Sequence, residues 1–283
     1  QYILRDESMH VNFGIDVICL GLSTTPTVEI AVTEENADAG IIITASHNPK
    51  NWNALKLLNE KGEFINAIEG KELIKVSESK KFIKVQEKKG DVFFKNDYIS
   101  RHINKILDLN CIEVDLIKKK RFKIVVDAVN STGGIAIPML LDKLNVECIK
   151  IYCDPNGEFP HNPEPLPENI TELSKSVVKN NADLGIVTDP DVDRLAFVCE
   201  DGLVFGEEYT LVACSDYYLG LYKGPTVSNL SSSRALREVT NSHGCEHFFS
   251  AVGEVNVVEL MKSKNAVIGG EGNGGVILPE LHY

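Results

Sequence analysis

The sequence from residue 184 to residue 199 reads LGIVTDPDVDRLAFVC. Its first five residues are mostly apolar or β-branched, which predicts a buried strand over Leu184–Thr188. A second apolar run predicts another strand over Leu195–Cys199. Between them lies an acidic loop at the carboxyl end of the first strand, the place where α/β proteins commonly bind ligands.

The acidic loop carries Asp189, Asp191 and Asp193 at alternating positions. Such carboxylates point to one side of the backbone and would repel one another unless a hard cation neutralised them. Mg²⁺ is favoured, because it takes carboxylate and phosphate oxygens and the loop contains no His or Cys. The loop lacks the Gly and closing Glu of an EF-hand. Arg194 is placed to clamp a phosphate beside such a metal, and the alternative is an acidic turn with an exposed Arg.

Similar strand-like runs alternate with helix-like segments along the chain, which predicts the α/β class. The further predicted strands are Gly40–Thr44, Lys123–Asp127, Val146–Tyr152, Pro225–Asn229 and Ala266–Gly269. Apolar spacing near 3.6 residues predicts helices over Tyr98–Leu109, Ile135–Leu144, Leu173–Asn180, Glu208–Leu219, Ser233–Ser242 and Val255–Lys262.

A chain of 283 residues exceeds what one hydrophobic core usually organises, so several domains are expected. Linker-like composition over Ser77–Asp91, and a turn at Asp201-Gly202 that precedes a helical unit, predict boundaries between domains at 1–95, 96–200 and 201–283. The Pro-rich segment Asp154–Pro167 is expected to be an irregular surface loop, because proline breaks both helix and sheet ladders.

The composition excludes several classes of protein. A formal net charge of −12 disfavours a general nucleic-acid binder, which needs a basic face. No apolar stretch approaches the roughly 20 residues that span a bilayer, so no membrane partner is expected. The seven cysteines are odd in number and never spaced C-x-x-C, which indicates reduced thiols in a cytoplasmic protein.

A second candidate site is the run Thr44–Pro49, which follows the predicted strand Gly40–Thr44. Ser46 in this position suits a nucleophile or phosphoryl carrier, although an ordinary turn would use the same residue types. His47 adjoins it. Lys56, ten positions after Ser46, is a candidate acid/base group or phosphate clamp, and the alternative is a solvated side chain.

A third candidate site is the glycine-rich run Gly269–Gly275, which surrounds Glu271 and Asn273. Its backbone permits close approach of a ligand, and the two side chains match vicinal hydroxyl groups as acceptor and donor. A sugar-binding loop and a flexible hairpin both fit this composition. A dinucleotide fingerprint is disfavoured, because no G-x-G-x-x-G opens a helix here.

These three sites resemble, in their order and approximate separations, the motifs of the α-D-phosphohexomutase family, which includes phosphoglucomutase, phosphomannomutase and phosphoglucosamine mutase. The resemblance implies three similar mixed-sheet α/β domains and a fourth, C-terminal domain that this chain does not contain. It also implies that the first domain is incomplete at its N-terminus and the third at its C-terminus. Supporting segments are Gly21–Thr27, Asn53–Lys56, Asn130–Gly134 and Phe159–Pro163.

The family resemblance also implies a function and a role for each site residue. A hexose phosphate would exchange its phosphoryl group between the 1- and 6-positions through a hexose 1,6-bisphosphate. Ser46 would be the phosphoserine and a ligand of Mg²⁺, with Asp189, Asp191 and Asp193. Arg194 would steady the phosphate, His47 and Lys56 would lie near the reacting hydroxyl group, and Glu271 and Asn273 would grip the sugar.

Departures from the family pattern leave the sugar open. Many members have Ser where this chain has Asn273, His where it has Gly275, and some have His where it has Glu254. Glucose or mannose phosphate is the expected substrate, and glucosamine phosphate is the alternative within the family. Outside it, a metal-dependent phosphatase and a non-catalytic sugar-phosphate-binding protein are the rival functions.

Overall fold

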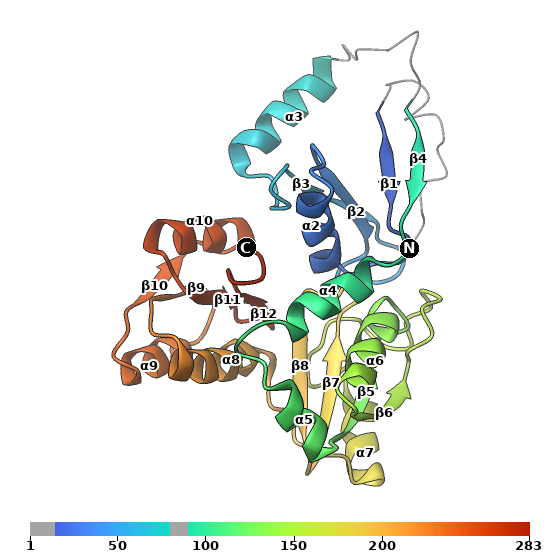
Figure 1. Ribbon diagram of the computed structural model, residues 1–283, viewed down its shortest axis with the longest axis vertical. Coiled ribbons are helices and arrows are strands. Elements are labelled where there is room, and N and C mark those ends of the chain that lie inside the picture. The colour runs from blue at the N-terminus through green and yellow to red at the C-terminus, as the bar shows by residue number, and fades with distance from the viewer. Residues whose placement is uncertain (1–14, 80–89) are drawn as a thin grey trace.

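The computed structural model describes residues 15–79 and 90–283, which form three consecutive α/β parts (Figure 1). The N-terminal part contains β1 to β4, the central part runs from α4 to β8, and the C-terminal part runs from α8 to β12. The predicted α/β class with mixed sheets is confirmed.

The central part is built on a four-stranded sheet with the order β6-β5-β7-β8. Strand β5 (Lys123–Asp127) pairs in parallel with β6 (Glu147–Ile151) and β7 (Leu184–Thr188). Strand β7 pairs antiparallel with β8 (Leu195–Cys199). All four strands agree with the sequence prediction, except that β6 is one residue shorter at each end.

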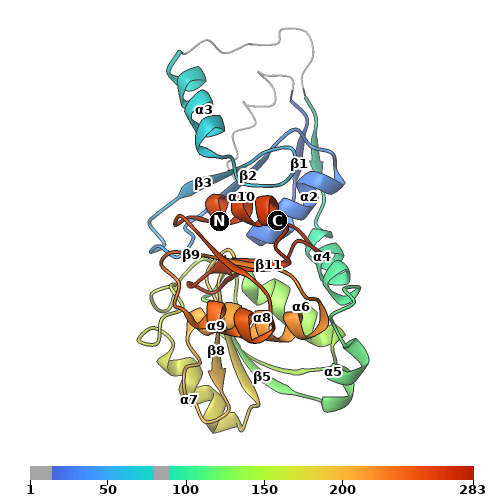
Figure 2. The same cartoon turned by 90° about the vertical axis from the view of Figure 1, so that its left-hand side faces the viewer.

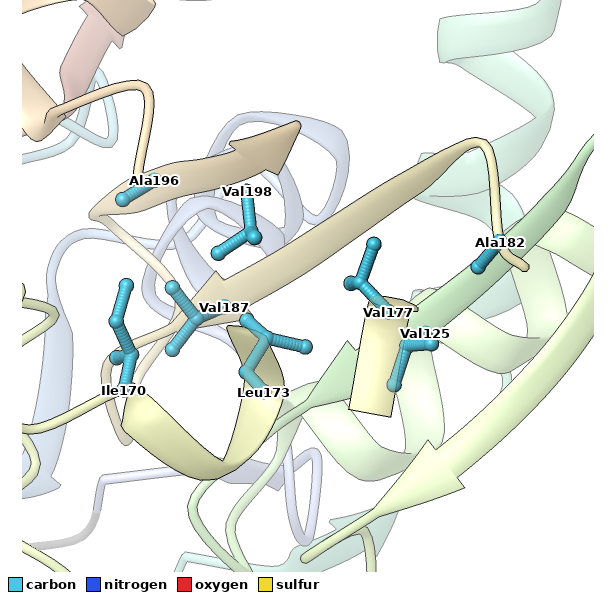
Figure 3. Close-up of a cluster of buried hydrophobic side chains, with 8 residues drawn as sticks. All are labelled: Val125, Ile170, Leu173, Val177, Ala182, Val187, Ala196 and Val198. Carbon is cyan, nitrogen blue, oxygen red and sulfur yellow. The ribbon is translucent and has the colours of Figure 1, made fainter. Parts of the chain in front are cut away.

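Side-chain alternation along β5 decides which helix covers which face. Val125 packs against α7 (Thr171–Asn180) in the buried cluster of Figure 3, whereas Ile124 and Val126 face the side of α6 (Gly133–Lys143). Each fully buried aliphatic side chain contributes about 1.5–3 kcal/mol, so both faces anchor the strand that ends at the site. The cluster in Figure 3 comprises Val125, Ile170, Leu173, Val177, Ala182, Val187, Ala196 and Val198.

The C-terminal sheet repeats the topology of the central sheet, with the order β10-β9-β11-β12. Strand β9 (Thr226–Asn229) lies parallel to β10 (His247–Ser250) and β11 (Ile268–Glu271), and β12 (Gly275–Ile277) pairs antiparallel with β11. Figure 2 shows α10 on one side of this sheet and α8 and α9 on the other. These helices span Glu207–Leu221 (α8), Ala235–Ser242 (α9) and Glu254–Lys264 (α10).

The N-terminal part contains two strand pairs. Strand β2 (Gly40–Thr44) pairs antiparallel with β3 (Ala54–Leu58), and β1 (Val17–Cys19) pairs in parallel with β4 (Val92–Phe94). Helix α2 (Thr25–Glu34) packs on the first pair through a small core of Val32, Ile42 and Leu58. Helix α3 (Ala67–Ser79) has no buried residue.

Helix α2 was not predicted from the sequence, because its Thr and Val residues have low helix propensity. Its start is instead fixed by capping. The Thr24 hydroxyl accepts a hydrogen bond from the Thr27 backbone N–H at 3.2 Å, and Pro26 lies in the first turn. The remaining helices are α4 (Tyr98–Leu107), which was predicted, and the short charged α5 (Val114–Lys120), which was not.

The expected linker over Ser77–Asp91 starts too early, because Ser77 to Ser79 belong to α3, and its positions 80–89 lie outside the described residues. The segment Asp154–Pro167 contains neither helix nor strand, as predicted. All seven cysteines are free thiols, in agreement with the expectation of reduced cysteines. Across residues 15–79 and 90–283, no helix combines the length and apolarity needed to cross a bilayer.

Candidate functional site

The acidic loop after β7 is held in a strained turn. The Val192 N–H donates to the Asp189 carbonyl at 3.2 Å, and Val192 has φ 63°, a left-handed conformation that is costly for a β-branched residue. The hydroxyl groups of Ser131 and Thr132 both donate to the Pro190 carbonyl, at 2.7 and 2.8 Å. Backbone strain of this kind persists where surrounding contacts enforce it, which is common at functional sites.

The three aspartates of this loop converge. One oxygen from each of Asp189, Asp191 and Asp193 lies within 4.8 Å of the others, and Asp189 and Asp191 are fully buried. Among the described residues, Asp189 Oδ2, Asp191 Oδ1 and Asp193 Oδ1 are buried without a hydrogen-bond partner. Buried carboxylate oxygens without partners are costly, and three that converge fit a hard cation such as Mg²⁺.

The second oxygen of each aspartate is held by the protein. Its partners are the Arg194 backbone N–H on Asp189 (3.2 Å), the Thr25 hydroxyl on Asp191 (2.7 Å) and the Lys56 ammonium on Asp193. Each carboxylate is therefore held through one oxygen, and its other oxygen has no hydrogen-bond partner among the described residues.

Lys56 reaches the cluster from β3 in the N-terminal part. Its Nζ lies 2.8 Å from Asp191 Oδ2 and also pairs with Asp193. Burial alone would lower the pKa of Lys56, but the charges of Asp193 and Asp191 outweigh it and hold this pKa above its usual range. The structure brings Lys56 to the aspartates as a paired cation, and its role as an acid/base group stays a prediction.

The pKa values of the aspartates differ because their partners differ. Burial, and then the charges of Asp193 and Asp191, raise the pKa of Asp189 well above its usual value. Burial would also raise the pKa of Asp193, but the charge of Lys56 reverses this and lowers it. The surroundings of Asp189 thus disfavour its charged form when no cation is bound.

The Ser46 loop begins where β2 ends. Ser46 has φ 50°, and its N–H donates to the Thr44 hydroxyl at 2.8 Å. Its Oγ lies 3.2 Å from His47 Nδ1, and burial followed by the charge of Arg194 lowers the pKa of His47. Among the described residues, the Ser46 hydroxyl group makes no hydrogen bond with the aspartates. Pairing of Ile42 with Lys56 nevertheless sets the Ser46 loop near the cluster.

The Pro-rich loop 154–167 touches both the Ser46 loop and the acidic loop. Glu158 pairs with Lys50, four residues after Ser46, and Glu164 accepts a hydrogen bond from Arg194 Nη1 at 3.4 Å. The guanidinium of Arg194 is thereby held against a carboxylate of the Pro-rich loop.

The glycine-rich run is a hairpin, one of the two structures that its composition allows, but the preceding strand, expected over Ala266–Gly269, spans Ile268–Glu271. Glu271 is the last residue of β11, and Gly275 is the first residue of β12. Glu271 Oε1 accepts from Asn229 Nδ2 at 2.5 Å, and its Oε2 accepts from Asn273 Nδ2 at 3.3 Å. The two predicted sugar-binding side chains therefore lie together at the hairpin.

The hairpin packs against the acidic loop. The Leu195 N–H, directly after Arg194, donates to the Gly274 carbonyl at 3.1 Å. Gly274 has φ +95°, and a Cβ there would lie 2.5 Å from the Leu195 carbonyl oxygen. Only glycine allows this close approach, which joins the third candidate site to the second.

Two further carboxylates were not recognised as site residues from the sequence. Burial, and then the charge of Asp193, raise the pKa of Glu254 to about 7. Burial, and then Glu254, raise the pKa of Glu29 well above its usual value. Glu254 begins α10 and Glu29 lies on α2, so no local motif links them.

The sequence matches three consecutive domains of one family. Residues 8–84 match phosphoglucomutase/phosphomannomutase alpha/beta/alpha domain I, residues 98–202 match domain II, and residues 206–283 match domain III.

Curated relatives share about a third of the aligned residues. A "Phosphoglucomutase/phosphomannomutase" of Thermococcus kodakarensis is 33% identical over 272 residues, which cover 95% of this chain and 59% of the relative. A "Probable phosphoglucosamine mutase" of Methanopyrus kandleri is 32% identical over 271 residues, with the same coverage. The chain thus spans about three fifths of the length of these relatives.

Solved structures show the same fold. A phosphoglucomutase/phosphomannomutase family protein from Burkholderia thailandensis superimposes with a TM-score of 0.79 over 95% of this chain and 59% of that chain, at 23% identity. With its three domain matches in order, the chain belongs to the phosphoglucomutase/phosphomannomutase (α-D-phosphohexomutase) family.

Proposed function

We propose that this chain is the catalytic body of a Mg²⁺-dependent phosphohexose mutase that acts through a phosphorylated Ser46. The observation that carries this proposal is the cluster of three converging aspartates, each with one buried oxygen that lacks a partner among the described residues, together with Lys56 from the strand beside the Ser46 loop. Phosphoryl transfer needs mainly positioning and charge neutralisation, and this arrangement supplies both.

In the proposed reaction, the bond between Ser46 Oγ and phosphorus breaks as a hydroxyl oxygen of the sugar bonds to phosphorus. Mg²⁺, held by Asp189, Asp191 and Asp193 with a phosphoserine oxygen, would neutralise charge on the transferring group. The Arg194 guanidinium binds the same phosphate from the other side. In the second transfer, the bond between the other phosphorus of the hexose 1,6-bisphosphate and its sugar oxygen would break as Ser46 Oγ bonds to that phosphorus, which restores the phosphoserine and frees a sugar hydroxyl group.

The basic side chains around Ser46 are proposed to carry out proton transfer. The lowered pKa of His47 keeps its imidazole neutral near pH 7, and it lies beside Ser46 Oγ, so it suits proton exchange at that oxygen. Lys56 is proposed as the acid/base group for the sugar hydroxyl, once a cation shares the charge of Asp191 and Asp193.

Glu271 and Asn273 are proposed to bind the sugar hydroxyl groups in both orientations of the bisphosphate. This proposal is supported by the hydrogen bond of Gly274, the neighbour of Asn273, to Leu195, which directly follows Arg194. Glucose or mannose phosphate is the proposed substrate, and glucosamine phosphate is the alternative, since relatives carry both kinds of name.

We further propose a division into domains at 1–95, 96–200 and 201–283. The separate sheets of the central and C-terminal parts support it. Because the chain spans about 59% of the length of these relatives, the activity is proposed for the whole protein.

The test is ³¹P NMR of the full-length protein with Mg²⁺, a trace of hexose bisphosphate, and the 1-phosphates of glucose, mannose and glucosamine in separate samples. Conversion to a 6-phosphate is expected, with loss of nearly all turnover in Ser46→Ala. Release of inorganic phosphate would indicate a phosphatase, and unchanged sugar phosphate would indicate a binding protein; either result contradicts the proposal.

A further inference from the structure

Thr25, the first residue of α2, makes two hydrogen bonds to one residue of the acidic loop. Its backbone N–H donates to the Asp191 carbonyl at 2.8 Å, and its hydroxyl donates to Asp191 Oδ2 at 2.7 Å. Thr25 is 1% exposed and Asp191 is fully buried. One residue of the N-terminal part therefore fixes both the main chain and the side chain of a residue 166 positions away.

These contacts determine which oxygen of Asp191 faces the cluster. Oδ2 receives the Thr25 hydroxyl and the Lys56 ammonium, at 2.7 and 2.8 Å. Oδ1 is buried without a partner among the described residues, which leaves it free to bind a cation in the cluster that Asp191 forms with Asp189 and Asp193. The terminal torsion of an aspartate is intrinsically broad, so a fixed donor on Oδ2 is what orients Oδ1.

The donor itself is held independently of the acidic loop. The Thr24 and Thr27 hydroxyl groups lie 2.7 Å apart, and the Thr24 hydroxyl caps the Thr27 N–H. The Thr27 hydroxyl lies 2.9 Å from His102 Nδ1 on α4. The first turn of α2 is therefore held against α4 independently of its contacts with Asp191.

We propose that Thr25 is a positioning residue for the metal ligand Asp191, and that it makes the cation affinity of the acidic loop depend on the N-terminal part of the chain. This inference rests on the magnesium site of the proposed function, but not on the mutase reaction. When a residue that orients a metal ligand without binding the metal itself is replaced, the metal affinity commonly falls by about 10- to 100-fold.

The test uses Mn²⁺ alone as the probe, with no sugar phosphate. Full-length protein is treated with phosphatase, so that all variants share one state of Ser46, and is stripped with EDTA. Free Mn²⁺ is then titrated by electron paramagnetic resonance. Thr25→Val deletes the hydroxyl at nearly constant volume, and Thr25→Ser keeps it. Thr33→Val, an exposed threonine on the same helix whose hydroxyl bonds only to the Ile30 carbonyl, is the matched control.

We expect Thr25→Val to weaken Mn²⁺ binding by about tenfold or more. Thr25→Ser and Thr33→Val should stay within about twofold of the wild type, because the first keeps the donor and the second never contacts the site. Thr25→Ala serves as a second hydroxyl-free variant if the valine variant does not fold. Thermal melts in EDTA identify the folded variants.

The inference would be overturned if the hydroxyl-free variants bound Mn²⁺ as tightly as the wild type. It would also be overturned if Thr25→Ser bound Mn²⁺ as weakly as Thr25→Val. Absence of Mn²⁺ binding by the wild type would overturn it together with the magnesium site. If the wild type binds Mn²⁺ but interconverts no sugar phosphate, the proposed mutase fails while the titration still decides the role of Thr25.

Discussion

Replacing Asp189 by Asn should stabilise the protein when no divalent cation is present. The cluster brings its carboxylate oxygens within 4.8 Å of one another, and at an effective dielectric constant of about 20 each like-charged pair costs about 3 kcal/mol. Lys56 offsets the charges of Asp191 and Asp193, but it makes no ion pair with Asp189. Asparagine keeps the Oδ1 acceptor for the Arg194 N–H, so a gain of about 2–3 kcal/mol is expected.

The pH dependence of this gain follows from the raised pKa of Asp189. Its folded state binds a proton more tightly than its unfolded state, because of burial and then the neighbouring charges of Asp193 and Asp191. Wild-type stability is therefore lost as the pH rises through the folded pKa, and the asparagine variant lacks this loss. The difference between the two should be largest on the alkaline side of neutrality.

Urea unfolding of both proteins at about pH 8 measures the effect, first in EDTA and then with saturating Mg²⁺. A cation at about 100 times its Kd stabilises the wild type by about 2.7 kcal/mol, and the variant should gain little. In EDTA the Asp189→Asn variant should be the more stable protein, and Mg²⁺ should narrow or reverse this difference in unfolding free energy. Asp142→Asn, at an exposed position outside the site, is the control and should change neither curve.

A less stable asparagine variant in EDTA would refute the reasoning, because it would show that the three carboxylates do not repel one another. Equal stabilisation of both proteins by Mg²⁺ would show that the cation binds elsewhere.

Further predictions concern single contacts. Gly274→Ala should destabilise the chain by about 1–3 kcal/mol and weaken sugar binding, since its Cβ would meet the Leu195 carbonyl at 2.5 Å; Gly70→Ala, in open space on α3, should be neutral or mildly stabilising by chemical unfolding. Lys56→Met should cost about 3 kcal/mol in EDTA by leaving buried carboxylates unpaired, and Mg²⁺ should recover part of it; an unchanged unfolding midpoint would contradict this ion pairing. Burial, then the charge of Arg237, lower the pKa of His247 to about 4, so its contribution to stability is present above about pH 6.5 and is lost as the pH falls towards 4. In His247→Gln, the free energy of unfolding should change less with pH across that range than in the wild type. An identical pH dependence in both proteins would show that His247 does not cause the loss of stability.

The sequence predicted the acidic loop and its flanking strands well, because both depend on local patterns. A run such as Leu184–Thr188 must be buried on both faces, and the following Pro and Asp residues can only end it. The hairpin was predicted less well: its residues were identified, but Glu271 proved to be part of a strand.

Local sequence patterns could not predict the contacts between segments that lie far apart in the sequence. The pairing of Thr25 with Asp191 joins positions 166 residues apart, and the Lys56 ion pairs depend on how β3 meets the central part. Helix α2 was missed because capping and packing outweigh the weak helix propensity of its β-branched residues. The threonines at its start lie in the family-like segment Gly21–Thr27, but no local pattern there predicts a partner for them.

The most direct test of the central claim is the transfer of a phosphoryl group to Ser46. Dephosphorylated full-length protein is incubated with hexose 1,6-bisphosphate and Mg²⁺, and the modified residue is located by mass spectrometry of its peptides. One phosphoryl group on Ser46, absent in EDTA and absent from Asp191→Asn, is the predicted result. Phosphorylation elsewhere, or none under any condition, would contradict the assignment of Ser46 and the acidic loop to one phosphoryl-transfer site.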